Sequence, residues 1–401
     1  MKTTLLFITL FTFQLIAKDK HLILAEGNGW YPHMAENLIN NYDNISKLPF
    51  SGFVVVGNSF TNLVMKKDKA LSYQDIWDEV KGLKGLYKNQ PHNFLQINIH
   101  FPADFWDDKA WEQVSKNFAL VAKASKALGF KGIVFDDEPY TKDAKQMVNY
   151  KFPSKKEVAL TPNRYSNSEK LGAEATWVDE HAYKNSAYTF EAHMKQVTLR
   201  FKQIMHTMLK EFPDMITLVY LGPSLAHINS NKEYPVVIDM GLPRENEYHG
   251  AIFTGLKQGL NAQAKLHDMG ESYKYRKDKD FKQAYQWRKY DIASDKYNEK
   301  LNPNLYWTLP KEERKNWAND VQIGFMVFNL GQKSSYLEFT TLHNSSVLDI
   351  EKTLNKALKY SDEYVIYYCE KQNWLLDDPK VFPLGAGWRE MMQRVYKQSK
   401  K

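Results

Sequence analysis

Three consecutive acidic residues follow a short apolar run near the middle of the first half of the chain. Residues 132–135 read as a short buried strand, and Asp136, Asp137 and Glu138 come directly after it. Pro139 then ends the strand, because proline cannot donate a ladder hydrogen bond. Carboxylates at the end of a buried strand are costly unless they are hydrated, paired or used in chemistry.

Two other predicted strands also end close to a carboxylate. Glu271 follows the strand over 264–269, and Glu370 follows the strand over 364–368. In a parallel barrel the carboxyl ends of all strands meet at one rim, so three separate strands are expected to bring carboxylates there. Glycoside hydrolysis needs such a pair, with one group protonated and the other ionised. We predict Glu138 as the general acid and Glu271 as the nucleophile or base, with Glu370 as the alternative partner.

Polar and aromatic side chains follow the same strand ends. Sugars present flat C–H faces and polar edges, so aromatic rings beside carboxylates and amides suit them. One acidic residue alone is more often a helix cap or an ion-pair partner, and one aromatic residue alone is more often packed in the core. The predicted substrate-binding residues are Asp136, Asp137, Tyr140, Trp30, His100, Trp106, His267, Asp268, Tyr273, Asn329 and Trp374.

The elements that must position these residues alternate between strand and helix. Eight such units predict an α/β fold, a (β/α)₈ TIM barrel with a long insertion after strand four. A doubly wound open sheet is the alternative, but no Gly-x-Gly-x-x-Gly follows the first strand. The predicted strands cover 21–25, 52–56, 94–99, 132–135, 215–221, 264–269, 323–328 and 364–368. We predict one catalytic domain over 18–401, with a polar loop insertion over 141–185 and a final helix over 385–401.

The first 17 residues are typical of a signal peptide. Lys2 precedes an apolar run over 5–16, and Ala17 is a small residue at a plausible cleavage point. The run is short for a bilayer span, so we predict a periplasmic or secreted bacterial protein without stable membrane insertion after cleavage. An uncleaved anchor is the alternative. Cys369 is the only cysteine, so no internal disulfide is expected.

The net charge of +7 comes from basic residues that are spread along the chain. No basic and aromatic groove of the nucleic-acid type is present, so we predict no nucleic-acid partner. A zinc site built from His100, His267, Asp268 and Glu271 is an alternative, but no His-Glu-x-x-His motif and no cysteine pair support it. We therefore predict no metal and no cofactor. The oligomeric state does not follow from the sequence.

The segment over 135–140, Phe-Asp-Asp-Glu-Pro-Tyr, resembles the Asn-Glu-Pro acid/base motif of the large (β/α)₈ glycoside hydrolase superfamily. Asp137 stands where those enzymes usually carry Asn. The segment is also similar to the acidic strand-four motif of chitinase-like hydrolases, whose acid is the last Glu. The stretch over 364–374 resembles the strand-eight segment of barrel glycosidases. No named family is assigned.

This resemblance implies a barrel glycosidase with Glu138 as its acid. The chain departs from the superfamily at strand seven, where a Glu nucleophile is usual, because that strand ends in Phe328-Asn329. The partner carboxylate must then come from strand six or eight. We expect an exported hydrolase acting on a polysaccharide or oligosaccharide. The alternatives are a carbohydrate-binding barrel without turnover, active in surface polysaccharide handling, and a metal-dependent hydrolase.

Overall fold

The structure is a computed structural model of the chain. It describes residues 19–26, 34–66, 68–99, 104–138, 190–223, 247–270, 275–294, 309–329, 346–369, 374–375 and 385–400. The predicted signal peptide and the predicted insertion over 141–185 lie outside these residues. Within them, no helix combines the length and the apolar character that crossing a membrane requires.

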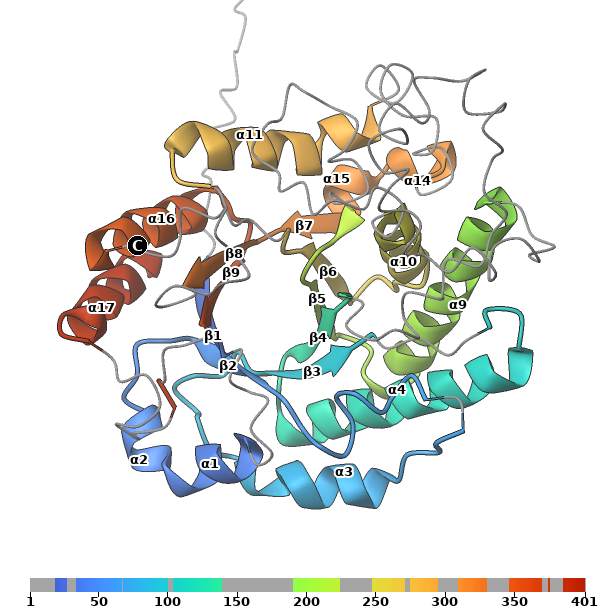
Figure 1. Cartoon of the computed structure of the whole chain (residues 1–401), viewed down its shortest axis with the longest axis horizontal. Coiled ribbons are helices and arrows are strands. Elements are labelled where there is room, and N and C mark those ends of the chain that lie inside the picture. Colours follow the sequence, from blue (N-terminus) through green and yellow to red (C-terminus); the bar gives the residue numbers. More distant parts are fainter. Residues whose placement is uncertain are drawn as a thin grey trace, which may run out of the picture.

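Parallel strands form a ring at the centre of the molecule (Figure 1). In hydrogen-bonded order they run β7-β6-β5-β4-β3-β2-β1-β9-β8, and every pairing is parallel. The bounds are β1 His21–Glu26, β2 Gly52–Val55, β3 Phe94–Asn98, β4 Gly132–Asp136, β5 Ile216–Val219, β6 Lys265–Asp268, β7 Val321–Ile323, β8 Phe325–Asn329 and β9 Tyr364–Cys369. The predicted strands all overlap these elements.

Only Gly324 separates β7 from β8, and this interruption closes the ring. β7 pairs with β6 on one side, whereas β8 pairs with β9 on the other. A side chain at Gly324 has no room, because a Cβ there lies 2.4 Å from Met269 Sδ and 2.8 Å from the Tyr364 carbonyl oxygen. The two segments therefore act as one interrupted strand of an eight-stranded barrel, which confirms the predicted fold class.

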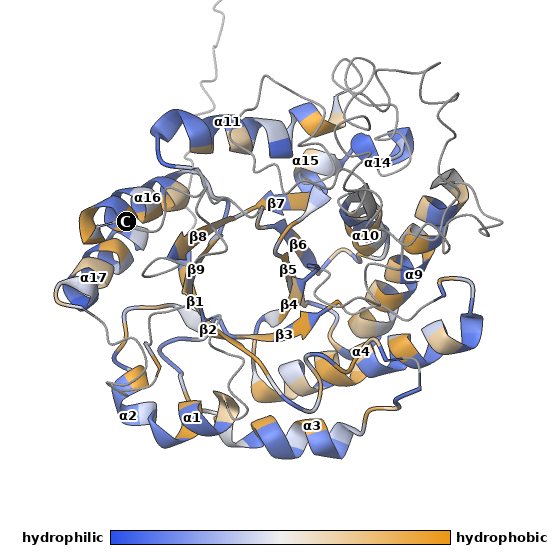
Figure 2. Cartoon of the chain, viewed as in Figure 1, coloured by the Kyte–Doolittle hydropathy of each residue, from blue (hydrophilic) through white to orange (hydrophobic). Residues whose placement is uncertain are grey.

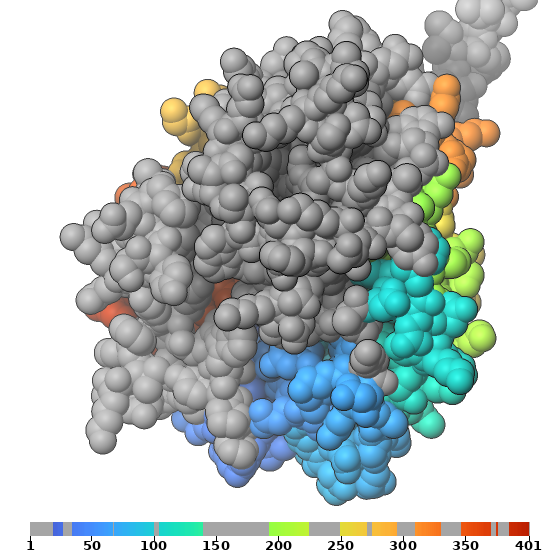
Figure 3. Space-filling model, turned by 45° about the vertical axis from the view of Figure 1, so that its right-hand side comes forward, coloured from blue at the N-terminus to red at the C-terminus, as the bar shows by residue number. Residues whose placement is uncertain are grey.

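Helices surround the barrel (Figure 1). α4 illustrates why they form where they do: Asp107 caps its first turn by accepting from the Ala110 N–H at 3.0 Å, and Gly129 ends it in the left-handed conformation. α3, α4 and α9 lie side by side on the outside (Figure 3). The helices are α1 Met34–Asn40, α2 Tyr42–Ile45, α3 Tyr73–Val80, α4 Asp108–Leu128, α9 Phe190–Glu211, α10 Glu247–Gln258, α11 Asp278–Lys289, α14 Lys311–Arg314, α15 Trp317–Asp320, α16 Val347–Tyr360 and α17 Trp388–Ser399, with 3₁₀ turns η2 Lys81–Leu83 and η6 Asp291–Ala293.

Alternate strand residues build two apolar layers. One cluster, which includes Ile23, Val134 and Ile366, fills the inside of the barrel. The other, which includes Ile133 and Phe135, packs between the strands and the helices. The ring of strands accordingly carries mostly hydrophobic colours, whereas α11 carries much hydrophilic colour (Figure 2). This alternation decides on which side of the barrel wall each polar residue at a strand end lies.

Candidate active site

The acidic run after β4 is divided between the two sides of the barrel wall. Val134 belongs to the inner cluster and Phe135 to the outer one, so Asp136 faces the inside and Asp137 the outside. The contacts agree, because Asp136 Oδ2 lies 3.5 Å from Gln96 Nε2 of the neighbouring strand. Of the two adjacent aspartates, only Asp136 is directed towards the mouth of the barrel.

Asp136 belongs to a polar group that we call the mouth cluster: Gln96, Asn98, Asp136 and Tyr220. Gln96 Nε2 donates to Asn98 Oδ1 at 2.8 Å, and the Tyr220 hydroxyl lies 3.3 Å from Gln96 Oε1. Asn98 Nδ2 donates to Asn62 Oδ1 at 2.8 Å, which ties the cluster to the segment after β2. Amides, a phenol and a carboxylate of this kind can bind hydroxyl groups of a ligand.

Glu138 lies two residues beyond Asp136 and is half-buried. Its backbone N–H donates to Asp136 Oδ1 at 3.2 Å, so the Asp136 carboxylate lies directly beside the Glu138 backbone. The predicted general acid therefore lies two residues beyond Asp136, the one of the two aspartates that faces the inside. Gln96, Asn98 and Tyr220 were not among the predicted site residues. Assigning alternate residues of β3 and β5 to the inside of the barrel, as for β4, identifies these three residues.

Asp137 and Asn329, both predicted to bind substrate, lie on the outer side of the wall. Asp137 is fully buried; its Oδ1 accepts from the Leu221 N–H at 3.0 Å, and its Oδ2 lies 2.8 Å from His249 Nδ1. Asn329 Nδ2 donates to the Tyr367 hydroxyl at 2.8 Å. Asp137 joins β4 to α10, and Asn329 joins β8 to β9; this placement favours a role in packing over contact with substrate.

His267 and Asp268 lie apart from the mouth cluster as well. His267 faces the inside but near the opposite end, with its ring edge-on to Tyr364 at 5.0 Å between centroids. Asp268 faces the outside, where Arg288 Nε donates to its Oδ2 at 2.9 Å and Arg288 Nη2 lies 2.7 Å from Oδ1. Both side chains are buried, so the carboxylate oxygens of Asp268 are engaged in a structural ion pair with Arg288. Neither position favours sugar binding.

The two predicted tryptophans that the structure describes are packed in the outer layer. Trp106 is partly buried against the outer core. Trp374 is 3% exposed, and its ring meets Phe50 edge-on at 5.3 Å and Tyr367 at 6.0 Å between centroids. Trp374 is therefore outside the barrel wall, not a platform at its mouth.

Glu26, which is not among the predicted site residues, is a buried carboxyl group at the end of β1. Its Oε1 accepts from the backbone N–H groups of Trp374 at 2.6 Å and Leu375 at 3.2 Å. Burial raises the pKa of Glu26 to about 8, and the two N–H donors act in the opposite direction. The Glu26 side chain anchors the segment that follows β9, and Cys369 is its ladder partner on that strand.

Six predicted site residues lie outside the described part of the chain. They are Glu271, Glu370, Trp30, His100, Tyr140 and Tyr273. The zinc alternative depended on two of them, and among the described residues no group of three or more His, Cys, Asp or Glu side chains is placed to hold a metal ion.

No protein-family model matches the chain, and no curated protein sequence is similar to it. Solved structures with a similar fold include a GH18 chitinase from Pseudoalteromonas aurantia, with 12% identity, a TM-score of 0.39, and coverage of 94% of this chain and 100% of that one. A β-1,4-D-mannanase from Cryptopygus antarcticus has 11% identity and a TM-score of 0.44, with 94% and 91% covered. A sugar phosphate isomerase/epimerase from Parabacteroides distasonis has 9% identity and a TM-score of 0.38, with 96% of each chain covered. These weak likenesses extend to different reactions, so the reaction has to be argued from the site.

Proposed function

We propose that the protein is an exported glycoside hydrolase that acts on a polysaccharide or oligosaccharide, with Glu138 as the general acid. The observation that supports this best is the Asp136 carboxylate, which faces the inside of the barrel and accepts from the Glu138 N–H. Active sites of (β/α)₈ barrels are built at the carboxyl ends of the strands, where both residues lie. We propose that the Glu138 carboxyl group lies close enough to Asp136 for the negative charge of Asp136 to favour a proton on Glu138, as an acid catalyst requires.

In the proposed reaction Glu138 gives its proton to the glycosidic oxygen as the bond from that oxygen to the anomeric carbon breaks. A second carboxylate attacks the anomeric carbon or removes a proton from the attacking water. Glu271, or Glu370 in its place, is the proposed partner. They follow β6 and β9, whose carboxyl ends lie at the same end of the barrel as that of β4. Gln96, Asn98 and Tyr220 are proposed to hold sugar hydroxyls.

The test is hydrolysis of a panel of glycans by the wild type and by Glu138→Gln. Release of a product that the Gln variant makes at least a hundredfold more slowly supports the proposal. A Gln variant that retains the full rate overturns the assignment of Glu138. If no glycan is cleaved but oligosaccharides bind to both proteins equally, the barrel binds carbohydrate without turnover, and the proposed function is wrong.

Export through residues 1–17 is part of the same proposal. Expression of the full chain in a bacterium, followed by fractionation and N-terminal sequencing, tests it. We expect mature protein outside the cytoplasm with its first residue at position 18. Full-length protein retained in the cytoplasm contradicts the proposed leader.

A further inference from the structure

A pocket lies outside the barrel wall, away from the mouth cluster. It has a volume of about 270 Å³ and lies between α2, the turn that follows α2, the Trp374-Leu375 segment and the first turn of α17. That volume is just below the roughly 300–1,000 Å³ of pockets that hold drug-sized ligands, so the pocket suits one small ring. None of its lining residues belongs to the proposed catalytic machinery.

The apolar wall of this pocket is held rigidly. Ile45, Leu48, Trp374 and Leu375 form it, and all four are buried. Trp374 is fixed by edge-on packing against aromatic neighbours, and its backbone N–H and that of Leu375 both donate to the same oxygen of Glu26. A rigid wall costs little entropy when a ligand binds against it.

The polar wall is positively charged. Lys47 and Arg389 contribute exposed side chains, and the pocket lining contains no acidic residue among the described ones. Neither cation forms an ion pair with a described residue, and the side-chain amide of Asn44 has no described hydrogen-bond partner. Guanidinium and ammonium groups bind carboxylates, and an amide can donate to and accept from hydroxyl groups.

We propose that this outer pocket binds a uronic-acid-type sugar unit, with its carboxylate at Lys47 and Arg389 and its C–H face on the apolar wall. Both features are needed, because a plain anion leaves the apolar wall uncovered and a neutral sugar leaves the two cations unpaired. The site is separate from the proposed catalytic centre and does not depend on hydrolysis.

The experiment is titration calorimetry on the mature chain with D-glucuronate, D-glucose and acetate. D-glucuronate has no glycosidic bond, so the measurement is independent of any hydrolytic activity. We expect glucuronate to bind at least tenfold more tightly than glucose or acetate, and to bind more weakly as salt is added. In Lys47→Gln/Arg389→Gln the affinity for glucuronate should fall at least tenfold.

The matched control is Lys116→Gln/Lys397→Gln, which removes the same charge from exposed positions on α4 and α17 outside the pocket. It should bind glucuronate like the wild type. All substituted side chains are exposed, so thermal melting should show folded proteins. Glucose or acetate binding as tightly as glucuronate, no measurable binding of glucuronate, or equal losses in the two double variants each overturn the proposal.

Discussion

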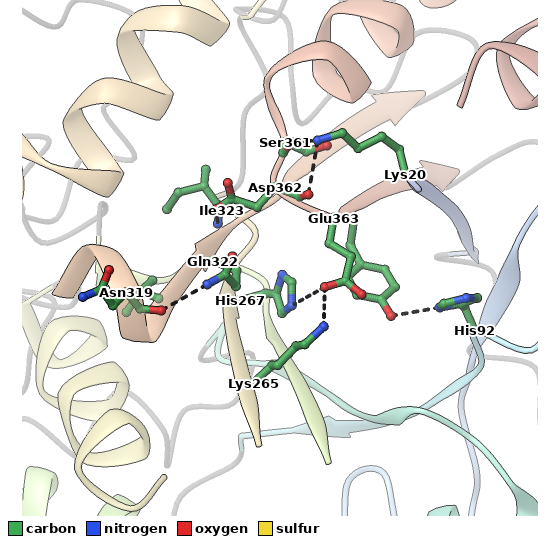
Figure 4. Close-up of polar contacts among 12 residues, drawn as sticks. Lys20, His92, Lys265, His267, Asn319, Gln322, Ile323, Ser361, Asp362 and Glu363 are labelled. Carbon is green, nitrogen blue, oxygen red and sulfur yellow. Dashed lines mark hydrogen bonds and ion pairs between the residues drawn. The ribbon is translucent and has the colours of Figure 1, made fainter. Parts of the chain in front are cut away.

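At the amino-terminal end of the barrel, titratable side chains contact one another (Figure 4). Lys265 Nζ lies 2.8 Å from Glu363 Oε2, His92 Nδ1 lies 2.9 Å from the Tyr364 hydroxyl, and the His21 and His92 rings stack with 3.5 Å between centroids. At the carboxyl-terminal end, the carboxylate of Asp136 accepts from the Glu138 N–H and lies beside a Gln96 amide.

The difference lies in how charge is balanced. The amino-terminal group sets the Lys265 ammonium against the Glu363 carboxylate, and burial lowers the pKa of His21 and His92 to about 3, so both imidazoles are neutral near pH 7. At the carboxyl-terminal end, Asp136 and Glu138 lie two positions apart on one strand end, and our proposal for Glu138 uses this pair of acidic residues for proton transfer. A set of titratable residues inside a barrel is therefore not by itself a sign of catalysis. On our proposal, the end of the barrel and the sign of the neighbouring charges distinguish a structural group from a catalytic one.

The largest expected effect compares one carboxylate at each end. Glu138→Gln should lower kcat about 10²–10⁴-fold with little change in melting temperature, because it removes the proton donor and keeps the shape. Glu363→Gln, the matched change at the amino-terminal end, should leave kcat unchanged. Steady-state kinetics on a substrate found in the glycan panel measures both. Equal losses of kcat in the two variants contradict the division between the ends.

Glu26 is a buried carboxyl group that lies at the carboxyl-terminal end of the barrel but outside the barrel wall. We expect it to act as a structural group, and its pKa makes this testable. With a folded pKa of about 8 and an unfolded value near 4.5, it releases a proton on unfolding between these pH values. Stability conferred by Glu26 is thus present below about pH 4.5 and is lost as pH rises to 8. Relative to the wild type, Glu26→Gln should gain up to about 1.4 kcal/mol of unfolding free energy per pH unit across this window.

Urea unfolding of the two proteins at several pH values between 4.5 and 8 gives this difference. Parallel pH dependences show that Glu26 does not titrate abnormally. The proposed hydrolysis should continue in Glu26→Gln, because Glu26 does not face the inside of the barrel.

For His21 we expect the opposite pH dependence, in which the unfolding free energy falls as the pH is lowered. Burial lowers the pKa of His21 from 6.5 to about 3, and the positive charges of Lys400, Lys131 and Lys265 act in the same direction. The folded state binds a proton less readily than the unfolded state, so stability is full above about pH 6.5 and is lost as pH falls towards 3. His21→Phe keeps a ring to stack on His92 and removes this titration.

The fall in unfolding free energy between pH 6.5 and 4 should therefore be shallower in His21→Phe, by at most about 1.4 kcal/mol per pH unit. Denaturant unfolding at a series of acidic pH values measures the slope. A slope equal to that of the wild type means that His21 is already protonated in the folded protein.

The smallest expected effect concerns the ion pair between Lys265 and Glu363. The Lys265 side chain is 42% exposed, so water screens the pair and its contribution is about 0.2–1 kcal/mol. Lys265→Gln should lower the unfolding free energy by no more than this, and the loss should shrink at high salt. A loss of several kcal/mol identifies the pair as part of a more strongly coupled network.

The strand positions were predictable because they depend on local pattern. The apolar run before Asp136 and the capped helix that ends at Gly129 both gave correct elements. The interruption at Gly324 was not predictable, because it reflects the approach of Met269 and the Tyr364 backbone from other strands. For the same reason, the sequence did not show that Asp268 pairs with Arg288 on the following helix. It also did not show that the Trp374 ring packs on residues that are distant in the sequence.

The sequence alone determined the order of strands and helices and the place of the acidic run at the end of β4, because hydrophobic period and capping act over a few neighbouring residues. Tertiary structure decided which of the adjacent aspartates faces the inside, since that depends on which face of β4 packs against the helices. It also brought Glu26 to the backbone of Trp374, 348 residues away, through the pairing of β1 with β9. Such contacts follow from the closure of the barrel, which no local pattern encodes.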